Sequence, residues 1–220
     1  MPPSTRYCGH CGQDHRYRRL QLRALVDGAL SDITSLDRPS LRTLRAIFPE
    51  CGTLARDYVE GRRVDHVGPL RFMLVMLGLL VLVNSALSTY SGSQDGAHSQ
   101  WLSVALIAYT LPMAYLLRFF CVTRQQDIVE VVAFVCYALS GAVLGWMVVF
   151  SLMASVFLNL AVWVGVFYAL VFVPVYWTIS LKRFFRCAWW RALIALCMVG
   201  FLGMFVFSRL MQAITELGNH

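Results

Sequence analysis

The stretch IVEVVAFVCYALSGAVLGWMVVFSLMASVFLNLAVWVGVFYALVFVPVYWTISL, residues 128–181, contains a single charged side chain, Glu130. A helix needs about 20 mainly apolar residues to cross a bilayer, so this stretch is too long for one crossing. We divide it near residues 151–155, where serines interrupt the apolar run. The division predicts two membrane-spanning helices, at about 128–150 and 156–181, and indicates an all-α integral membrane protein.

The sequence on both sides of this stretch supports the same fold class. The chain is 58% hydrophobic and 14% charged, with a mean hydropathy of +0.62, whereas soluble domains have roughly 45–50% apolar and about 25% charged residues. We predict about five transmembrane helices in a bundle of residues 68–210, followed by a tail at 211–220. The three further spans lie at about 69–88, 101–120 and 189–208.

The distribution of Lys and Arg predicts the orientation, because cytosolic loops are enriched in both residues. Basic residues precede the first span and crowd the second and fourth loops, whereas Arg209 alone lies on the opposite side. We therefore expect the N-terminus in the cytosol and the C-terminus outside, in the periplasm. The cations on the predicted cytosolic side are Arg62, Arg63, Arg118, Arg124, Lys182, Arg183, Arg186 and Arg191.

Residues 1–16 contain a CxxC motif that resembles a zinc knuckle. Cys8 and Cys11 are separated by two residues and followed by a glycine, and two such thiolates can bind one side of a tetrahedral zinc ion. A structural site needs four ligands, and His15 and Cys51 are candidates for the other two. A second copy of the chain could supply them instead, or the two cysteines could be free thiols.

Residues 17–67 read as a helical segment on the cytosolic side of the membrane. Apolar residues recur at three- and four-residue steps over residues 20–36 and again over 41–48, which Pro49 ends. A third short stripe stops at Gly61, which is typical of a helix C-terminus. These stripes could pack on one another, lie on the bilayer surface, bind a partner helix or cap the bundle.

A family resemblance follows from motifs spread over about residues 7–85. The motifs are Tyr7-Cys8-x-x-Cys11-Gly12-Gln13, Leu36-Asp37, Leu41-Arg42-Thr43-Leu44, Phe48-Pro49, Tyr58-Val59-x-Gly61-Arg62-Arg63 and Pro69-Leu70-Arg71-Phe72. Together they resemble a family of bacterial membrane proteins catalogued as domain of unknown function 3667. The resemblance implies a bacterial inner-membrane protein with a zinc-ribbon-like start, and it implies no reaction. Many members of that family carry two CxxC knuckles, whereas this chain has one.

The predicted spans lack the residues that membrane enzymes use. They contain no histidine and no pair of aspartates, and the chain has neither an HExxH motif nor a P-loop. Nucleic acid is an unsuitable partner, because acidic residues nearly balance the arginines of residues 1–67 and no basic run contains aromatic residues. Gly141 and Gly145 form a GxxxG pattern, which predicts close helix packing.

We therefore favour a non-enzymatic membrane protein that acts through contacts of its N-terminal segment with protein or lipid. Arg62, Arg63 and Arg71 are the candidate residues for the membrane surface or a partner. The alternative is a small transporter or lipid-handling protein, because Pro112 and Pro174 can kink spans two and four. A redox enzyme using the CxxC thiols is a third hypothesis, although no βαβ pattern follows the motif.

Overall fold

A computed structural model describes residues 38–62, 66–91, 96–121, 127–154 and 164–218 of the chain. Within these ranges the regular structure is helical throughout, so the predicted all-α class is confirmed for this part of the chain. The predicted stripe at residues 20–36 and the CxxC motif lie outside the described residues. The elements are α2 (Arg38–Val59), α3 (Pro69–Ser91), α4 (Gly96–Cys121), α5 (Ile128–Ala154), the π-helical turn η1 (Tyr168–Phe172), α7 (Val173–Phe185) and α8 (Trp189–Gly218).

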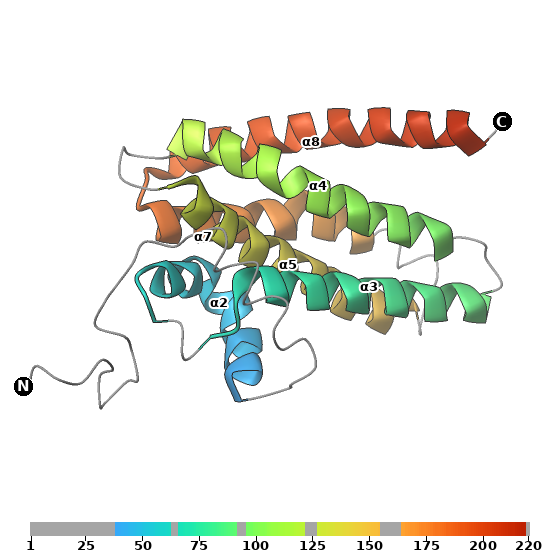
Figure 1. Cartoon of the computed structure of the whole chain (residues 1–220), viewed down its shortest axis with the longest axis horizontal. Helices are drawn as coiled ribbons and strands as arrows, with labels where there is room; N and C mark the ends of the chain where they lie inside the picture. Colours follow the sequence, from blue (N-terminus) through green and yellow to red (C-terminus); the bar gives the residue numbers. More distant parts are fainter. Residues whose placement is uncertain (1–37, 63–65, 92–95, 122–126, 155–163, 219–220) are drawn as a thin grey trace, which may run out of the picture.

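The long helices form a bundle, and α2 lies against one end of it (Figure 1). Helix α5 is central, because it contacts α2, α3, α4 and α7. Helix α8 packs mainly on α4 and also contacts α7. The first half of α5 is surrounded on all sides, and residues 131–138 are all buried. The helix begins at Ile128, where the carbonyl of Asp127 accepts the amides of Glu130 and Val131 at 3.0 and 3.3 Å.

Among the described residues, four helical stretches are long and apolar enough to cross a membrane. They lie close to the first four predicted spans. The predicted division near residues 151–155 falls at the end of α5, which continues to Ala154, and residues 155–163 lie outside the described part. The fifth predicted span corresponds to α8, in which the apolar portion is the shorter Trp189–Gly203. The four candidate spans are Pro69–Ala86, Ser103–Cys121, Ile128–Val149 and Val164–Phe185.

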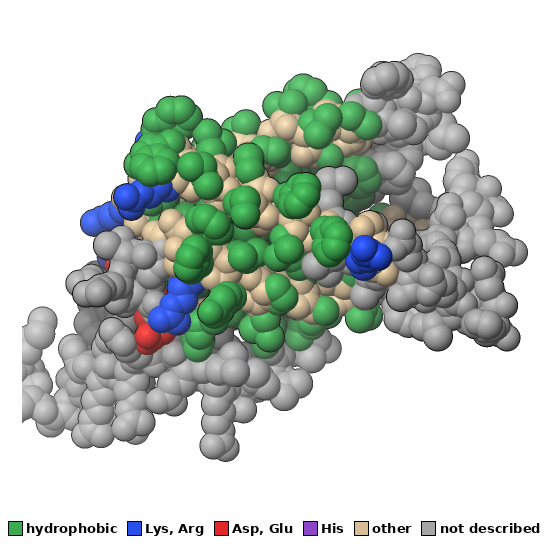
Figure 2. Space-filling model, turned by 90° about the horizontal axis from the view of Figure 1, so that it is seen from above, with side chains coloured by type: hydrophobic (Ala, Val, Ile, Leu, Met, Phe, Trp, Pro, Cys, Tyr) green, Lys and Arg blue, Asp and Glu red, His purple; other side chains and the backbone are tan. Residues whose placement is uncertain are grey.

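The surface of the bundle is apolar in the way that a lipid-facing protein requires. Figure 2 shows hydrophobic side chains covering one face, with most of the visible Lys and Arg side chains at one end. Such a continuous apolar surface is rare on a soluble monomer and is typical of a membrane protein. Among the most exposed large side chains are Leu82 (68%), Phe119 (79%), Leu170 (71%) and Phe201 (76%).

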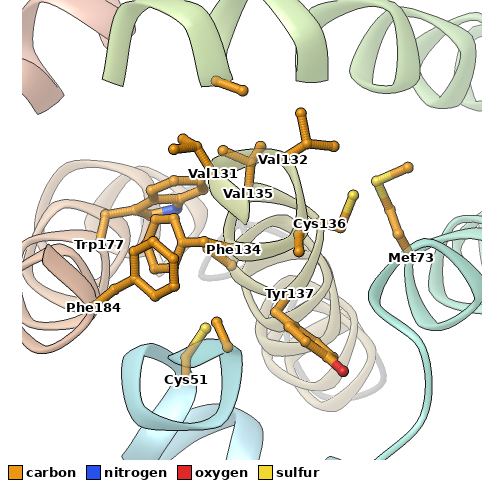
Figure 3. Packing of buried hydrophobic residues seen from close by; sticks show 14 of the residues in the cluster. Cys51, Met73, Val131, Val132, Phe134, Val135, Cys136, Tyr137, Trp177 and Phe184 are labelled. Carbon is orange, nitrogen blue, oxygen red and sulfur yellow. The ribbon is translucent and has the colours of Figure 1, made fainter. Parts of the chain in front are cut away.

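Aromatic side chains fill the junction between α5 and α7. Phe134 of α5 stacks on Phe184 with ring centroids 4.7 Å apart, and it meets Trp177 and Phe185 edge-on at 6.1 and 5.8 Å. Figure 3 shows Phe134, Trp177 and Phe184 together, with Cys51 of α2 pointing towards them. Because lipid is as apolar as these side chains, packing rather than hydrophobicity stabilises such a contact between helices.

Candidate functional site: the docking of α2 on the bundle

Helix α2 is broken in the middle by a proline. Pro49 has no amide hydrogen and its ring interferes with the preceding turn, and Glu50 directly after it leaves helical geometry, with φ −135° and ψ 27°. Two halves result, residues 38–49 and 51–59, and the break falls where the sequence predicts a helix end. In Figure 1 the first half runs across the direction of the bundle helices.

Side chains of α7 bind the carbonyl groups at the break. The last carbonyls of a helical segment have no partner within it, and leaving such a group unpaired in a buried place costs about as much as a lost hydrogen bond. The hydroxyl of Tyr176 donates to the carbonyl of Ile47 at 3.0 Å. The guanidinium of Arg183 donates to the carbonyl of Pro49. Seven residues separate these two donors, so they lie on the same face of α7.

Gly52 allows the backbones of α2 and α7 to approach closely. A Cβ atom at this position would overlap the carbonyl oxygen of Ser180 and lie 2.8 Å from Cβ of Arg183. Real Cβ atoms essentially never approach that closely. The second half of α2 can therefore sit against α7 only because residue 52 has no side chain.

Cys51 is a core side chain in this arrangement. It is 1% exposed, and its thiol interacts with the side chains of Tyr176 and Ser180. Burial raises the pKa of the Cys51 thiol to about 11, against the weaker opposing effect of these hydrogen bonds. A thiol that stays protonated is a poor metal ligand, because the thiolate is the form that binds zinc.

The other three candidate zinc ligands, Cys8, Cys11 and His15, lie outside the described residues. In the part of the chain that the structure describes, no three His, Cys, Asp or Glu side chains are grouped so as to hold a metal ion. The geometry around Cys51 therefore gives this residue a packing role between α2 and α7.

A second set of contacts joins α2 to the residue that leads into α3. The hydroxyl of Thr43 accepts the amide of Val67 at 3.1 Å, and the hydroxyl of Tyr137 on α5 donates to the carbonyl of the same residue. The ring of Tyr137 also lies edge-on to Tyr58 at 6.0 Å and near Phe72 at 6.2 Å. Val67 is thus held by both of its backbone polar groups, two residues before the first candidate span begins.

The end of α2 has the geometry predicted for Gly61. Its φ is +106°, a conformation that glycine adopts without strain. The amide of Gly61 donates to the carbonyl of Tyr58 at 3.2 Å, and the amide of Arg62 donates to the backbone carbonyl of Asp57 at 2.9 Å. This pair of bonds is the Schellman motif, which satisfies the last carbonyls of a helix.

The three arginines expected at a membrane surface or partner have different surroundings. Arg62 is exposed and lies 3.7 Å from the carboxylate of Asp57. Arg71 is half-buried in the first turn of α3. Arg63 lies outside the described residues. An exposed pair such as that of Arg62 contributes little to stability, typically about 0–1 kcal/mol, so Arg62 is available for other contacts at small cost.

Two tyrosine side chains pack against Gly141 and Gly145, the GxxxG glycines of α5. A Cβ atom at Gly141 would overlap the hydroxyl of Tyr176, and one at Gly145 would lie 2.5 Å from that of Tyr168. Tyr168 in η1 also donates to the carbonyl of Ala142 at 2.6 Å. The close packing at these glycines is therefore between a helix backbone and phenol rings of the same chain.

The tyrosines that connect the elements were not predicted from the sequence. Tyr137, Tyr168 and Tyr176 each donate to a backbone carbonyl of another part of the chain, as does Tyr109 to Val199 at 2.5 Å. A phenol hydroxyl inside a predicted span was a usable signal, because a buried hydroxyl needs a partner. These contacts satisfy backbone groups and pack side chains, which is the chemistry of a docking interface.

Comparison with known proteins supports the family resemblance over part of this interface. The sequence model of the family described as "Protein of unknown function (DUF3667)" matches residues 40–81. The match covers most of α2 and the first half of α3, and includes Thr43, Pro49, Gly52 and Gly61. Neither the search of curated proteins nor the search of solved structures finds a match.

Proposed function

We propose that this chain is a non-enzymatic protein of the bacterial inner membrane that acts through protein or lipid contacts of its cytosolic N-terminal segment. The observation that carries the proposal is the docking of α2. Because Tyr176, Arg183 and Gly52 attach α2 to the bundle, the segment before it is joined to a fixed point at the membrane. The family match lies on this attachment.

The proposed topology has five spans, with α8 as the fifth, the N-terminus in the cytosol and the C-terminus in the periplasm. Exposed cations at the end of α7 and the start of α8 support this orientation, because they mark the side on which α2 lies. Within this topology, Cys8 and Cys11 remain our proposed zinc ligands. The other two ligands are His15 and one from a second copy of the chain, or both come from that second copy. Cys51 is left out of the proposed set because of its place in the core.

In-cell crosslinking tests the proposed function. Full-length chain and a chain lacking residues 1–37, which retains α2, are expressed at equal levels, crosslinked and purified. We expect at least one crosslinked protein or a lipid class to be lost with the shortened chain. Identical contacts in both would contradict the proposal. Unchanged thermal stability of the shortened chain serves as the control for folding.

The second candidate is a small transporter or lipid-handling protein, and one observation favours it. Span four is irregular, because the π-helical turn Tyr168–Phe172 directly precedes α7, in which Pro174 lies in the first turn. Such turns are often found at functional sites. Solute flux through reconstituted protein that disappears in Pro112→Ala/Pro174→Ala would support this candidate, and flux that survives both changes would remove its structural basis.

A further inference from the structure

The break in α2 separates two halves of different charge. Residues 38–49 contain three arginines and no Asp or Glu, whereas the acidic residues Glu50, Asp57 and Glu60 all follow the break. Two of these acids lie beside arginines of their own half, since Arg56 binds Glu60 at 2.6 Å and Arg62 lies 3.7 Å from Asp57. The first half is therefore a purely basic segment.

This first half has one face on the bundle and one face away from it. Thr43 and Ile47, four residues apart, are completely buried, whereas Arg42 and Arg45 are exposed on the opposite side. Phe48 is 39% exposed, although its ring also lies beside Gly145. A basic helix with an aromatic residue at the edge of its polar face is the pattern of a helix that lies in a membrane interface.

A backbone contact places this half of α2 beside the start of the first candidate span. Thr43 accepts the amide of Val67, and the first candidate span begins two residues later, at Pro69. Residue 43 therefore lies next to the segment that leads into the first candidate span. The first half also runs across the bundle helices (Figure 1), which places it roughly parallel to the plane of the bilayer.

We infer that the exposed face of residues 38–49, with Arg42 and Arg45 as its contact residues, binds the head groups of anionic phospholipids in the cytosolic leaflet. The inference rests on the proposed membrane placement and names the lipid class that the N-terminal segment contacts. Phosphodiester head groups complement the basic sequence of residues 38–49, which contains no Asp or Glu, and guanidinium groups bind phosphate oxygens with paired hydrogen bonds.

Native mass spectrometry of the detergent-purified full chain tests this inference. The protein is titrated with phosphatidylglycerol or phosphatidylcholine, and the apparent affinity of the first bound lipid is measured. Wild type is expected to prefer phosphatidylglycerol. Two cations near an anionic lipid surface together strengthen binding about thirtyfold, so Arg42→Gln/Arg45→Gln is expected to weaken phosphatidylglycerol binding about thirtyfold and leave phosphatidylcholine binding unchanged.

The matched control is Lys182→Gln/Arg186→Gln, which removes two exposed cations at the same end of the bundle from another element. An equal loss in this control would overturn the inference, because binding would then belong to the whole basic end. Unchanged phosphatidylglycerol affinity in Arg42→Gln/Arg45→Gln would overturn it as well. Circular dichroism and elution volume identify a misfolded variant, and then the single changes Arg42→Gln and Arg45→Gln give the same comparison.

The lipid-binding test and the crosslinking test of the proposed function can fail independently. A chain lacking residues 1–37 keeps Arg42 and Arg45, so its lipid preference tests α2 alone. Loss of partner contacts in that chain with full lipid preference supports both statements. Failure of the crosslinking experiment with an arginine-dependent lipid preference would leave the inference standing and remove only the protein-contact part of the proposal.

Discussion

Three glycines, Gly52, Gly141 and Gly145, occupy positions where even a methyl group would collide with a neighbouring element. At each of them the neighbour is a backbone carbonyl or a tyrosine hydroxyl that takes part in the docking of α2 or in the packing of η1 and α7. The chain contains other helical glycines with open surroundings, of which Gly78 is one. At these three positions glycine is therefore required for close approach, and not for backbone freedom.

Substitution of Gly141 tests this requirement. Gly141→Ala is expected to lower the free energy of unfolding by about 1–3 kcal/mol, the usual cost of overpacking a filled site. Gly78→Ala is the control, and should be neutral or slightly stabilising because alanine favours helix. The measurement is unfolding by sodium dodecyl sulfate in mixed micelles. Equal effects of the two changes would contradict the described packing.

The thiol of Cys51 gives a test that depends on pH. In the folded chain its pKa is about 11 instead of 9.0, because burial disfavours the thiolate. A variant with Cys51 as its only cysteine should react with N-ethylmaleimide at pH 8 much more slowly than one that retains only the half-buried Cys187. Denaturant should remove the difference. The same shift means that this residue's contribution to stability is present below about pH 9 and is lost as pH rises towards 11.

The cysteines of the CxxC motif give a separate prediction. Detergent-purified wild type is expected to contain about one zinc per chain, or about half if two copies share a site. Cys8→Ser/Cys11→Ser should contain none, whereas Cys51→Ala should retain the full amount. Elemental analysis measures all three. Loss of zinc in Cys51→Ala with an intact fold would contradict the purely structural role that its burial assigns to it.

At the scale of elements, α2 and α7 form one unit although about 130 residues separate them along the chain. Tyr176, Ser180 and Arg183 lie at steps of four and three residues, so one face of α7 meets α2. Helix α7 thereby completes the hydrogen bonding of a helix that a proline has interrupted. This explains how a broken helix can be a stable part of the structure.

Removing the donors of α7 should loosen α2. Tyr176→Phe is expected to cost about 0.5–1.5 kcal/mol, the net value of a typical hydrogen bond, and Tyr176→Phe/Arg183→Gln should expose α2 to protease. Limited proteolysis with mass spectrometry locates the new cleavage within residues 38–62. The exposed neighbour Lys182→Gln is the control and should leave the pattern unchanged. Protection of α2 in the double variant would show that these donors do not hold it.

Local chemistry predicted much of the helix pattern, but not the contacts between helices. Pro49 and Gly61 act on their own turns, so the break in α2 and its end could be read from the sequence. The partners of Ile47 and Pro49 are donors near residue 180, and no local signal connects them. Gly141 and Gly145 predicted close packing, although not that phenol rings would fill the space. No local signal showed that Cys51 is buried between α2 and α7.

At the scale of the whole molecule, the number of crossings decides where the C-terminus lies. In the part of the chain that the structure describes, four stretches have the length and composition of spans. Helix α8 has a shorter apolar portion followed by Arg209, and it continues to Gly218. With five crossings the two ends of the chain lie on opposite sides of the membrane. With four, both would lie in the cytosol.

Cysteine labelling in cells distinguishes these two cases. In a cysteine-free background, Ser93→Cys and Asn219→Cys should both react with a membrane-impermeant maleimide added from outside, after the outer membrane is opened. Gln125→Cys should react only after the inner membrane is permeabilised as well. Labelling of Asn219→Cys that follows the pattern of Gln125→Cys would mean four crossings and a cytosolic C-terminus.

The central claim is that the segment matched by the family model is docked on the bundle, and photo-crosslinking from Phe48 tests it most directly. Phe48 is partly exposed, so it can be replaced by benzoylphenylalanine, and its ring lies beside Gly145 of α5. We predict an intramolecular crosslink to α5 or η1 near Gly145 and Tyr168, and none from the same probe at the exposed Leu82 of α3. Crosslinks from position 48 to lipid or other proteins alone would contradict the docking of α2.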